Sequence, residues 1–329
     1  MKVLVTGGGG FLGGAIVRQL LSRGDQVRSF ARSDYPSLRK LGVDVVCGDL
    51  SDTAAVSNAI GGCDAVIHVA ARAGIWGSRQ QFWEPNVNGS QNVLDACRSH
   101  GIRRLVFTSS PSVVHGDGAI EGGDESLPYP ERFLAPYPES KAEAERRILS
   151  ANDDELTTVA LRPHLIWGPH DPQFLPRLIE KSRTGKLALI GDGSNLVDTT
   201  YIEDAARAHL LALDRATPDA ACAGKPYFIT QGSPMPIRHI LNGLLNAVGE
   251  PKVTRSIPSA LAYPLGAALE VSFRMLGKQQ EPPMTRFLAH QLSTAHWYDI
   301  SAAQRDLDYA PAISIAEGLS QLRSWYQNE

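Results

Sequence analysis

Short apolar runs alternate with longer amphipathic segments along the first half of the chain. Each run spans four or five residues, which is a typical length for a buried strand. Between the runs, apolar residues recur at the three- and four-residue spacing of helices that pack on one face. The runs that we predict as strands are residues 2–6, 27–31, 43–46, 65–69, 104–108 and 157–161.

The segments between these runs predict helices, of which residues 88–99 and 140–149 are the clearest. The first helix follows the first strand, and Gly24 lies where we expect it to end. Strands that alternate with helices pair in parallel through right-handed crossovers, so we predict an α/β fold with a doubly wound parallel sheet. Such sheets bind ligands at the carboxyl ends of their strands. The apolar face of the first helix consists of Phe11, Leu12, Ile16, Val17, Leu20 and Leu21.

The regular alternation ends after about Gly168, where proline and glycine become frequent. Residues 204–213 predict one more helix, which we expect to pack on the first domain. We therefore predict a first domain at residues 1–168, with about 195–215 packing back onto it, and a smaller, irregular substrate-binding domain at residues 169–329. The chain has no internal repeat and no low-complexity tract.

Residues 257–276 are the most apolar stretch of the second domain. Three roles are open for it: a helix packed on the small domain or at a dimer contact, a lid over apolar ligand tails, or a lipid-facing patch. Prolines and charges argue against a membrane span, namely Pro258, Pro264, Glu270 and Arg274. The side chains that share a helical face are Leu261, Leu265, Leu269, Ser272 and Leu276.

The composition is that of an ordinary soluble enzyme, with 43% hydrophobic and 20% charged residues among 329. A net charge of -3 and the absence of any Lys/Arg-rich block give no reason to expect a nucleic acid partner. The four cysteines form no CxxC pair and the nine histidines show no metal-ligand spacing, so we expect reduced thiols and no metal. Because Met1 leads straight into the first strand, we expect no signal peptide and a cytoplasmic location.

A glycine-rich loop joins the first strand to the first helix. Gly7, Gly10 and Gly13 have the spacing G-x-x-G-x-x-G, with Phe11 and Leu12 between the last two. These glycines allow a tight turn, a close approach of a pyrophosphate and close packing of helix on strand. The free N–H groups and partial positive charge of the helix N-terminus favour the same ligand. The loop therefore predicts a dinucleotide cofactor.

The end of the second strand predicts the choice of cofactor. An NAD site usually has an acid there for the ribose 2′-OH, but this chain has Ala31 followed by Arg32 and Ser33. Arginine suits a 2′-phosphate, so we expect NADP(H) to be preferred, with Arg32 and Ser33 holding the phosphate. Asp34 lies close by and could replace the missing acid, which leaves NAD(H) open.

The end of the third strand carries Asp49 and Leu50. We expect Asp49 to lie within reach of the adenine ring. It could equally be the N-cap of the helix that follows.

The predicted chemical site lies where the fifth strand ends in Ser109 and Ser110. In the next helix, Tyr137 and Lys141 are four residues apart, so both lie on one face. An ammonium beside a phenol lowers the pKa of the phenol, which lets tyrosine exchange a proton near neutral pH. Hydride transfer to a carbonyl requires such an acid.

In order along the chain, TGGGGFLG, GDL, VIHVAA, NVNGSQNVLDAC, VFTSSPSVV, PYPESK and LRPHLIWGP resemble the extended short-chain dehydrogenases/reductases, which have a Rossmann domain. The resemblance implies Ser110, Tyr137 and Lys141 as catalytic residues, with Ser109 as the competing serine. The cofactor-pocket positions that it implies are Ala70, Ala71, Asn86 and Pro163.

The later motifs GDGSNLVDTTYI and YDI resemble the 3β-hydroxysteroid dehydrogenase branch. The motif AARAGIWGS and the sequence of residues 284–292 are similar to the ketone reductases of bacterial long-chain olefin biosynthesis. That resemblance implies NADPH-dependent reduction of long-chain 2-alkyl-3-oxoalkanoic acids to their 3-hydroxy acids. It also implies a homodimer, and leaves open an assembly with other enzymes of the pathway and a peripheral membrane contact.

A two-tailed keto acid needs an apolar channel and a group for its carboxylate. We predict Arg72 or Arg79 for the carboxylate, although either could be an ordinary loop arginine, with Trp76 and His164 as further substrate residues. The alternatives are a 3β-hydroxysteroid or sterol dehydrogenase, a nucleotide-sugar epimerase, for which the second half lacks an obvious basic cluster, and a non-catalytic dinucleotide sensor.

Overall fold

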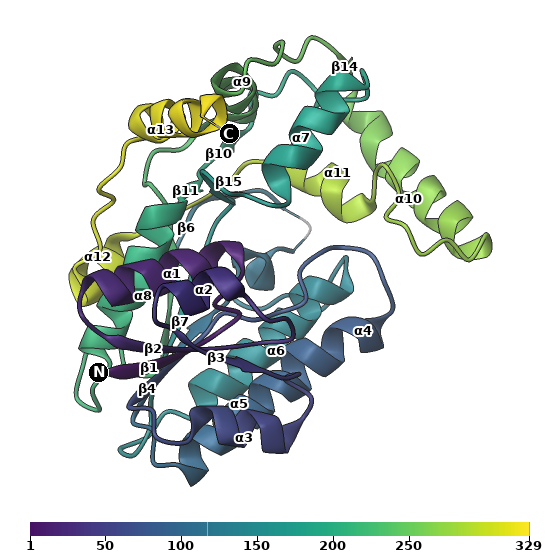
Figure 1. The fold of residues 1–329 in the computed structure, drawn as a ribbon. Helices are drawn as coiled ribbons and strands as arrows, with labels where there is room; N and C mark the ends of the chain where they lie inside the picture. Colours follow the sequence, from purple (N-terminus) through teal and green to yellow (C-terminus); the bar gives the residue numbers. More distant parts are fainter. Residues whose placement is uncertain (117, 329) are drawn as a thin grey trace.

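The computed structural model describes residues 1–116 and 118–328. Its centre is a parallel sheet of seven strands in the order β12-β7-β5-β4-β1-β2-β3 (Figure 1). The strand order reverses between β1 and β4, so a crevice opens at the carboxyl ends of these strands. The strands are β1 (Lys2–Thr6), β2 (Gln26–Ala31), β3 (Asp44–Cys47), β4 (Ala65–His68), β5 (Arg104–Thr108), β7 (Thr157–Pro163) and β12 (Lys225–Ile229).

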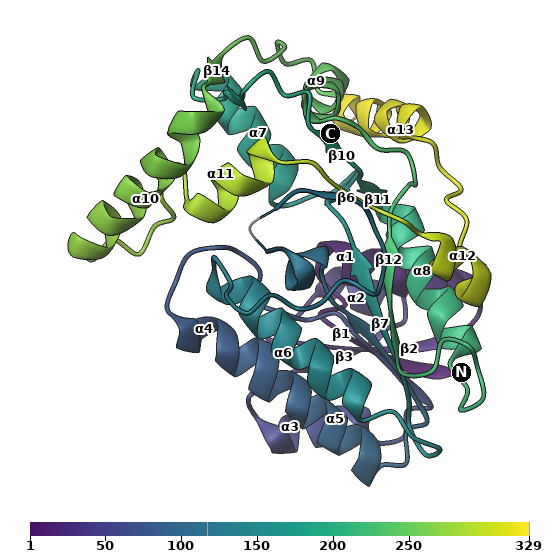
Figure 2. The same ribbon diagram turned by 180° about the vertical axis from the view of Figure 1, so that it is seen from behind.

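Helices cover both faces of this sheet, and the central strands bury side chains on both sides. Val3 and Val5 of β1 belong to the core under α1 and α8, whereas Leu4 belongs to the core under α3 and α5. Figure 2 shows α3, α5 and α6 together on one side of the sheet and α1 and α8 on the other. The helices are α1 (Phe11–Ser22), α3 (Thr53–Ile60), α5 (Gly89–Ser99), α6 (Pro136–Ser150) and α8 (Ile202–Arg215).

The predicted doubly wound sheet is confirmed, and all six predicted strands are present with ends shifted by up to two residues. The helix predicted over residues 140–149 begins earlier, at Pro136. Tyr137 and Lys141 therefore both lie in α6 and share a helical face. The sequence did not predict β12, which adds an edge strand to the main sheet from the second half of the chain.

A second sheet has the strand order β13-β10-β15-β6. Its strand β6 comes from the first half of the chain and pairs with β15, just as β12 joins the main sheet from the second half. The division into two domains at residue 168 stays a prediction. Each of the two sheets contains one strand from the other side of that boundary. The strands are β6 (Ile120–Gly123), β10 (Leu196–Val197), β13 (Met235–Pro236) and β15 (His296–Tyr298), with the pairs β8 (Ile166–Trp167) and β11 (Thr200–Tyr201), and β9 (Leu189–Ile190) and β14 (Ser256–Ile257).

Shorter elements connect these parts. The first half of the chain contains α2 (Pro36–Lys40), α4 (Arg79–Trp83), the π-helix η1 (Glu84–Asn88) and the 3-10 helix η2 (Pro111–Val114). The second half adds α7 (Phe174–Arg183), α9 (Ile237–Ala247), α10 (Ser259–Met275), α11 (Arg286–Ser293), α12 (Ser301–Leu307) and α13 (Ile315–Gln327).

Helix α10 projects from the body of the molecule and packs mainly on α11 (Figure 1). Its buried side consists of Ala262, Gly266 and Glu270, so the leucine face that the sequence predicts is not the packed one. Of the eight exposed large hydrophobic residues in the described chain, six lie on α10 or at its end: Leu261, Tyr263, Leu265, Val271, Met275 and Leu276. None of the described helices is both long and apolar enough to cross a membrane.

Candidate active site

A pocket of about 550 Å³ lies at the switch point of the main sheet. Gly7 adopts a left-handed backbone conformation (φ 70°). At Gly13 a Cβ atom would lie 2.1 Å from the carbonyl oxygen of Gly7, so only glycine lets α1 approach β1 this closely. The predicted cofactor residues that line the pocket are Gly7, Gly10, Phe11, Leu12, Gly13, Arg32, Ser33, Asp49, Leu50, Ala70 and Ala71.

The N-terminus of α1 faces this pocket. Its N-cap residue, Gly10, offers no side-chain acceptor, so the first N–H groups of the helix remain available to a ligand. A pyrophosphate is a suitable ligand for such an end, because the helix dipole places partial positive charge there.

The end of β2 brings Arg32 and Ser33 to the pocket rim, where both are exposed. Asp34, the alternative acid, does not line the pocket, and its carboxylate pairs with Arg39 at 2.9 Å. The arrangement leaves Arg32 as the charged group that can meet a 2′-phosphate.

Asp49 lines the pocket but does not cap a helix. Asp52 is the N-cap of α3, where its carboxylate accepts the N–H of Ala55. The Asp49 carboxylate instead accepts the backbone N–H and the hydroxyl of Ser51, at 2.9 and 2.8 Å. These hydrogen bonds, with the charge of Arg32, lower the pKa of Asp49. The N-cap alternative for Asp49 is therefore wrong.

Asn86 is buried and ties the loop after β4 to the helix that carries Tyr137. Its side chain accepts the N–H of Arg72 at 2.7 Å and donates to the carbonyl of Arg72 at 3.1 Å. It also donates to the hydroxyl of Ser140, which bonds the carbonyl of Tyr137. Asn86 thus connects Arg72 in the wall of the pocket to α6, although Asn86 does not line the pocket itself.

Tyr137, Lys141 and the end of β5 meet beside this pocket. The Lys141 ammonium is buried, donates to the carbonyl of Thr108 at 2.6 Å and lies 4.0 Å over the ring of Phe107. Burial lowers the pKa of Lys141 to about 7, although the charge of Glu145 opposes this. Lys141 is therefore held against the strand that ends in the two candidate serines.

The pKa of Tyr137 is raised, not lowered. Burial raises it, and the hydrogen bond with the Ser110 hydroxyl lowers it by less. Lys141 points to the carbonyl of Thr108 and leaves the phenol to Ser110. The expectation that Lys141 lowers the pKa of Tyr137 is wrong for this arrangement, because loss of solvent is the larger effect.

The two serines differ in surroundings. Ser109 is buried, and within the described residues its hydroxyl has no hydrogen-bond partner. Ser110 is partly exposed, and its hydroxyl lies 2.9 Å from that of Ser112. Ser110 therefore stays our candidate for contact with a carbonyl. The sequence did not single out Ser112, because a third serine two residues on carries no motif of its own.

The predicted substrate residues separate into two groups. Arg79 pairs with Glu139 at 2.9 Å and stacks on Trp83, so its charge is already engaged. Arg72 lines the pocket, lies 5.1 Å over the ring of Phe82, and forms no ion pair within residues 1–116 and 118–328. The ring of Phe82 in turn packs edge-on against Tyr137. The geometry therefore favours Arg72 over Arg79.

Trp76 and His164 lie away from the cofactor pocket. The indole of Trp76 donates to the carbonyl of Lys278 at 3.3 Å and packs edge-on against Phe273, so it connects the loop after β4 to α10. His164 follows Pro163 at the end of β7, is buried, and bonds the Asp198 carboxylate at 2.6 Å. His164 is thus committed to a protein carboxylate.

The model of the 3-beta hydroxysteroid dehydrogenase/isomerase family matches residues 4–258. The chain is 54% identical to the 2-alkyl-3-oxoalkanoate reductase of Stenotrophomonas maltophilia, over 98% of this chain and 99% of that protein. It is 34% identical to the decarboxylating sterol-4-alpha-carboxylate 3-dehydrogenase of Mus musculus, over 97% and 89%. A dTDP-glucose 4,6-dehydratase from Streptomyces venezuelae, solved with NAD bound, superposes with a TM-score of 0.77 at 26% identity, over 100% of this chain and 98% of that one.

Proposed function

The chain belongs to the 3-beta hydroxysteroid dehydrogenase/isomerase family, and from this premise we propose that it reduces long-chain 2-alkyl-3-oxoalkanoic acids with NADPH. The product is the 2-alkyl-3-hydroxyalkanoic acid, in the biosynthesis of long-chain olefins. The enzyme is an oxidoreductase of the extended short-chain type with a nicotinamide cofactor. The proposal concerns the substrate, the choice of NADPH and the residues that act.

The observation that carries the proposal is the meeting of Ser110, Tyr137 and Lys141 beside the pocket of the glycine loop. NADPH, when bound, supplies the hydride. Ser110 donates a hydrogen bond to the carbonyl oxygen, and Tyr137 gives it a proton as negative charge develops there. The raised pKa of Tyr137 keeps the phenol protonated at neutral pH, which is the form that reduction needs. Lys141 holds the end of β5 in place.

Two features of the pocket support a phosphorylated dinucleotide as the cofactor. Close packing at Gly13 and the uncapped start of α1 make room for a pyrophosphate and provide its donors. Arg32 and Ser33 on the rim suit a 2′-phosphate, whereas Asp34 is paired with Arg39. NADPH is therefore the preferred cofactor in our proposal.

The names of the two relatives share one chemical feature: a carboxylate on the carbon next to the carbon that carries the oxygen. In our proposal Arg72 binds this carboxylate, because it lines the pocket, is free of ion pairs in the described chain and is one ring away from Tyr137. The exposed apolar side chains of α10 cover the alkyl tails, and Trp76 connects that helix to the loop of Arg72.

The test is oxidation of a racemic 2-alkyl-3-hydroxyalkanoic acid, which is stable to the decarboxylation that destroys β-keto acids. We expect NADP⁺ reduction with this acid and at least tenfold lower kcat/KM with a 3β-hydroxysteroid. Equal or better use of NAD⁺ would contradict the role of Arg32. Tight cofactor binding without turnover of either substrate would favour a dinucleotide sensor.

A sterol carboxylate is the second candidate, supported by the 34% identity to sterol-4-alpha-carboxylate dehydrogenases. Like the acyclic acid, this sterol has a carboxylate on the carbon next to the oxygen-bearing carbon. The same assay distinguishes the two substrates. Turnover of a 4-carboxy sterol above that of the acyclic acid would favour this candidate.

A further inference from the structure

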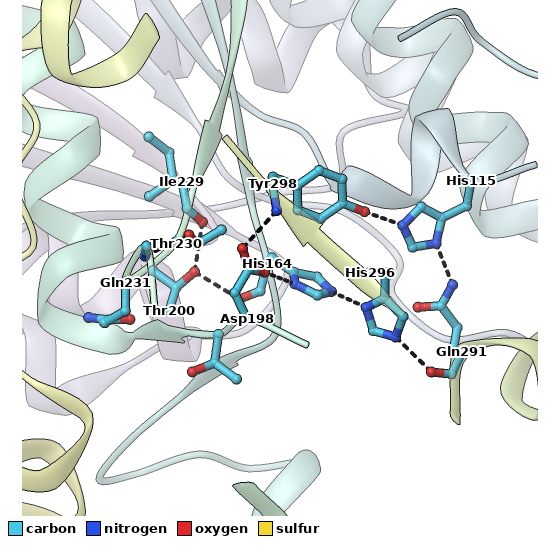
Figure 3. Close-up of polar contacts among 12 residues, drawn as sticks. His115, His164, Asp198, Thr200, Ile229, Thr230, Gln231, Gln291, His296 and Tyr298 are labelled. Atoms are coloured by element: carbon cyan, nitrogen blue, oxygen red, sulfur yellow. Dashed lines mark hydrogen bonds and ion pairs between the residues drawn. The ribbon is translucent and has the colours of Figure 1, made fainter. Parts of the chain in front are cut away.

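Buried polar side chains form a cluster between the end of the main sheet and the second sheet (Figure 3). They come from five separate places in the chain, and none lines the cofactor pocket. No group of metal-ligand type is found within residues 1–116 and 118–328. The members are His115 after η2, His164 after β7, Asp198 between β10 and β11, Gln291 on α11, and His296 and Tyr298 on β15.

One branch of the cluster runs from a carboxylate to a backbone carbonyl. The Asp198 carboxyl group bonds Nδ1 of His164 at 2.6 Å and accepts the backbone N–H of Tyr298 at 2.9 Å. Nε2 of His164 lies 3.1 Å from Nδ1 of His296. Nε2 of His296 lies 2.6 Å from the carbonyl oxygen of Gln291. Every ring nitrogen of this branch therefore has a partner.

The partners determine where the protons lie. A carbonyl only accepts, so Nε2 of His296 carries a proton. Burial lowers the pKa of His296 to about 3, so this is its single ring proton and Nδ1 is an acceptor. Nε2 of His164 must then donate to Nδ1 of His296. His164 is thus held between His296 and the Asp198 carboxyl group, which also accepts the backbone N–H of Tyr298 on β15.

The second branch reaches the turn that carries Ser110. His115 bonds the Tyr298 hydroxyl through Nε2 and the Gln291 side-chain amide through Nδ1. Burial, together with His296 and His164, lowers the pKa of His115 well below its ordinary value, so its ring is neutral. The two partners of His115 lie on β15 and α11, which belong to the predicted second domain.

Ser110 and His115 lie at the two ends of the 3-10 helix η2. Ser110 is its N-cap, with the hydroxyl accepting the N–H of Ser112, and His115 is its C-cap. All four residues between them are buried. A displacement of His115 therefore passes through one short, packed turn to the Ser110 hydroxyl.

We propose that His115 and Gln291 are positioning residues that orient the Ser110 hydroxyl, and that the hydrogen bonds of Asp198 with His164 and with the backbone of Tyr298 hold β15 in the position that this requires. The proposal rests on the proposed role of Ser110. It also connects α10 to the reaction, because Glu270 of α10 bonds both the backbone and the guanidinium of Arg286 at the start of α11. A ligand under α10 thus acts on the same helix that holds His115.

The first test needs no catalysis. Protein with ¹⁵N-labelled histidine is examined by NMR at neutral pH. We expect His296 and His115 to be protonated on Nε2 only. A proton on Nδ1 of His115 would overturn the hydrogen bond from the Gln291 amide whether or not the proposed reaction is correct.

The second test is a double-mutant cycle in the full-length enzyme. Gln291→Met removes the amide bonded to His115 with little change in size. We expect kcat to fall about tenfold, with NADPH affinity and Tm close to wild type, since small misplacement at a reacting centre is costly. In Ser110→Ala, the same change should have no further effect on kcat. Equal losses in both backgrounds, or no loss in either, would overturn the positioning role.

Ser293→Ala is the matched control, because this hydroxyl lies on α11 and bonds only the carbonyl of His290 in the same helix. It should leave kcat unchanged. Gln291→Asn retains an amide and should recover part of the lost rate. If Ser110→Ala alone leaves kcat intact, the role of Ser110 fails and the positioning proposal fails with it, while the NMR result still decides the contact between His115 and Gln291.

Discussion

Helices α1 and α10 are both rich in apolar residues, yet they bury opposite kinds of side chain. In α1 the large residues Leu12, Ile16 and Leu20 are buried against the sheet and α8. In α10 the buried residues are Ala262, Gly266 and Glu270, whereas Leu261 and Leu265 are exposed. At Gly266 a Cβ atom would lie 2.7 Å from the backbone of Thr285, so this helix is attached through its small residues.

The difference between the buried residues of α1 and those of α10 indicates that the two helices have separate tasks. Large buried residues make the cofactor side rigid before any ligand arrives, which suits chemistry that every substrate shares. An exposed apolar helix lowers the solubility of a protein unless a ligand or partner covers it. Helix α10 therefore suits a binding site for a long apolar tail. Changes on the cofactor side should therefore affect all substrates alike, and changes on α10 should depend on chain length.

The largest effect is expected for Tyr137→Phe. Loss of the proton donor should lower kcat by about 10³-fold for short and long substrates alike, because general acid catalysis contributes on the order of 10²–10⁴. Cofactor affinity, measured by fluorescence titration, should change little. Tyr263→Phe on α10 removes an exposed hydroxyl and should leave kcat unchanged. A loss of kcat that is confined to long substrates would contradict the division of tasks between the cofactor side and α10.

Ser110→Ala should lower kcat by about 10²-fold, the typical loss when one hydrogen bond to a developing oxyanion is removed. Ser109→Ala is the matched control, one residue away in the same strand end. Its hydroxyl is buried without a partner in the described residues, so kcat should stay near wild type. Initial rates at saturating substrate measure both. The reverse order of effects would assign the role to Ser109.

Arg72→Ala should raise KM for the acid about tenfold, because a hydrogen bond to a charged group contributes about 1.5–3 kcal/mol. A neutral ketone of the same length should show a smaller change. Arg79→Ala should affect both substrates equally and weakly, since that arginine pairs with Glu139. If the two substrates respond alike to Arg72→Ala, the carboxylate is bound elsewhere.

Leu265→Ser and Val271→Ser on α10 should lower kcat/KM about fivefold for long tails and hardly at all for short ones. Each removes an apolar contact with the tail of the size of a partly buried side chain. Both residues are exposed, so Tm should not fall. Leu41→Ser, another exposed leucine, is the control far from α10. Equal effects on all lengths would show that α10 does not contact the tails.

The last prediction concerns stability rather than turnover, and it rests on Lys141 and pH. Its pKa is about 7 in the fold and near 10.5 when unfolded, so between these values the unfolded chain binds a proton that the folded chain lacks. The free energy of unfolding should therefore rise with pH over this window, by up to about 1.4 kcal/mol per unit from this group. The destabilisation is fully present below pH 7.

Urea unfolding of the cofactor-free protein at pH 7 to 9 measures this slope. Lys141→Met should lack the contribution, and Lys278→Met, at an exposed lysine after α10, should retain it. Parallel pH profiles for wild type and Lys141→Met would contradict the lowered pKa.

Local patterns were enough to predict most of the cofactor side. The glycine spacing, Arg32 after β2 and the four-residue step from Tyr137 to Lys141 depend on neighbours in sequence, so strand and helix geometry alone bring them to one edge of the sheet. Asp49 shows the limit of such reasoning, because two acids three residues apart compete for the cap of α3 and only the backbone selects Asp52.

The amino-acid sequence by itself determined the alternating elements, the glycine loop and the chemistry that Tyr137 and Lys141 can perform, because each follows from short-range periodicity. Only the tertiary structure decided that Asp34 is paired with Arg39, that burial raises the pKa of Tyr137, and that α10 leaves Leu261 and Leu265 exposed. It also decided that His115 and Gln291, 176 residues apart, meet beside the turn of Ser110. Burial and pairing are properties of what surrounds a residue, and distant segments provide those surroundings only after the chain has folded.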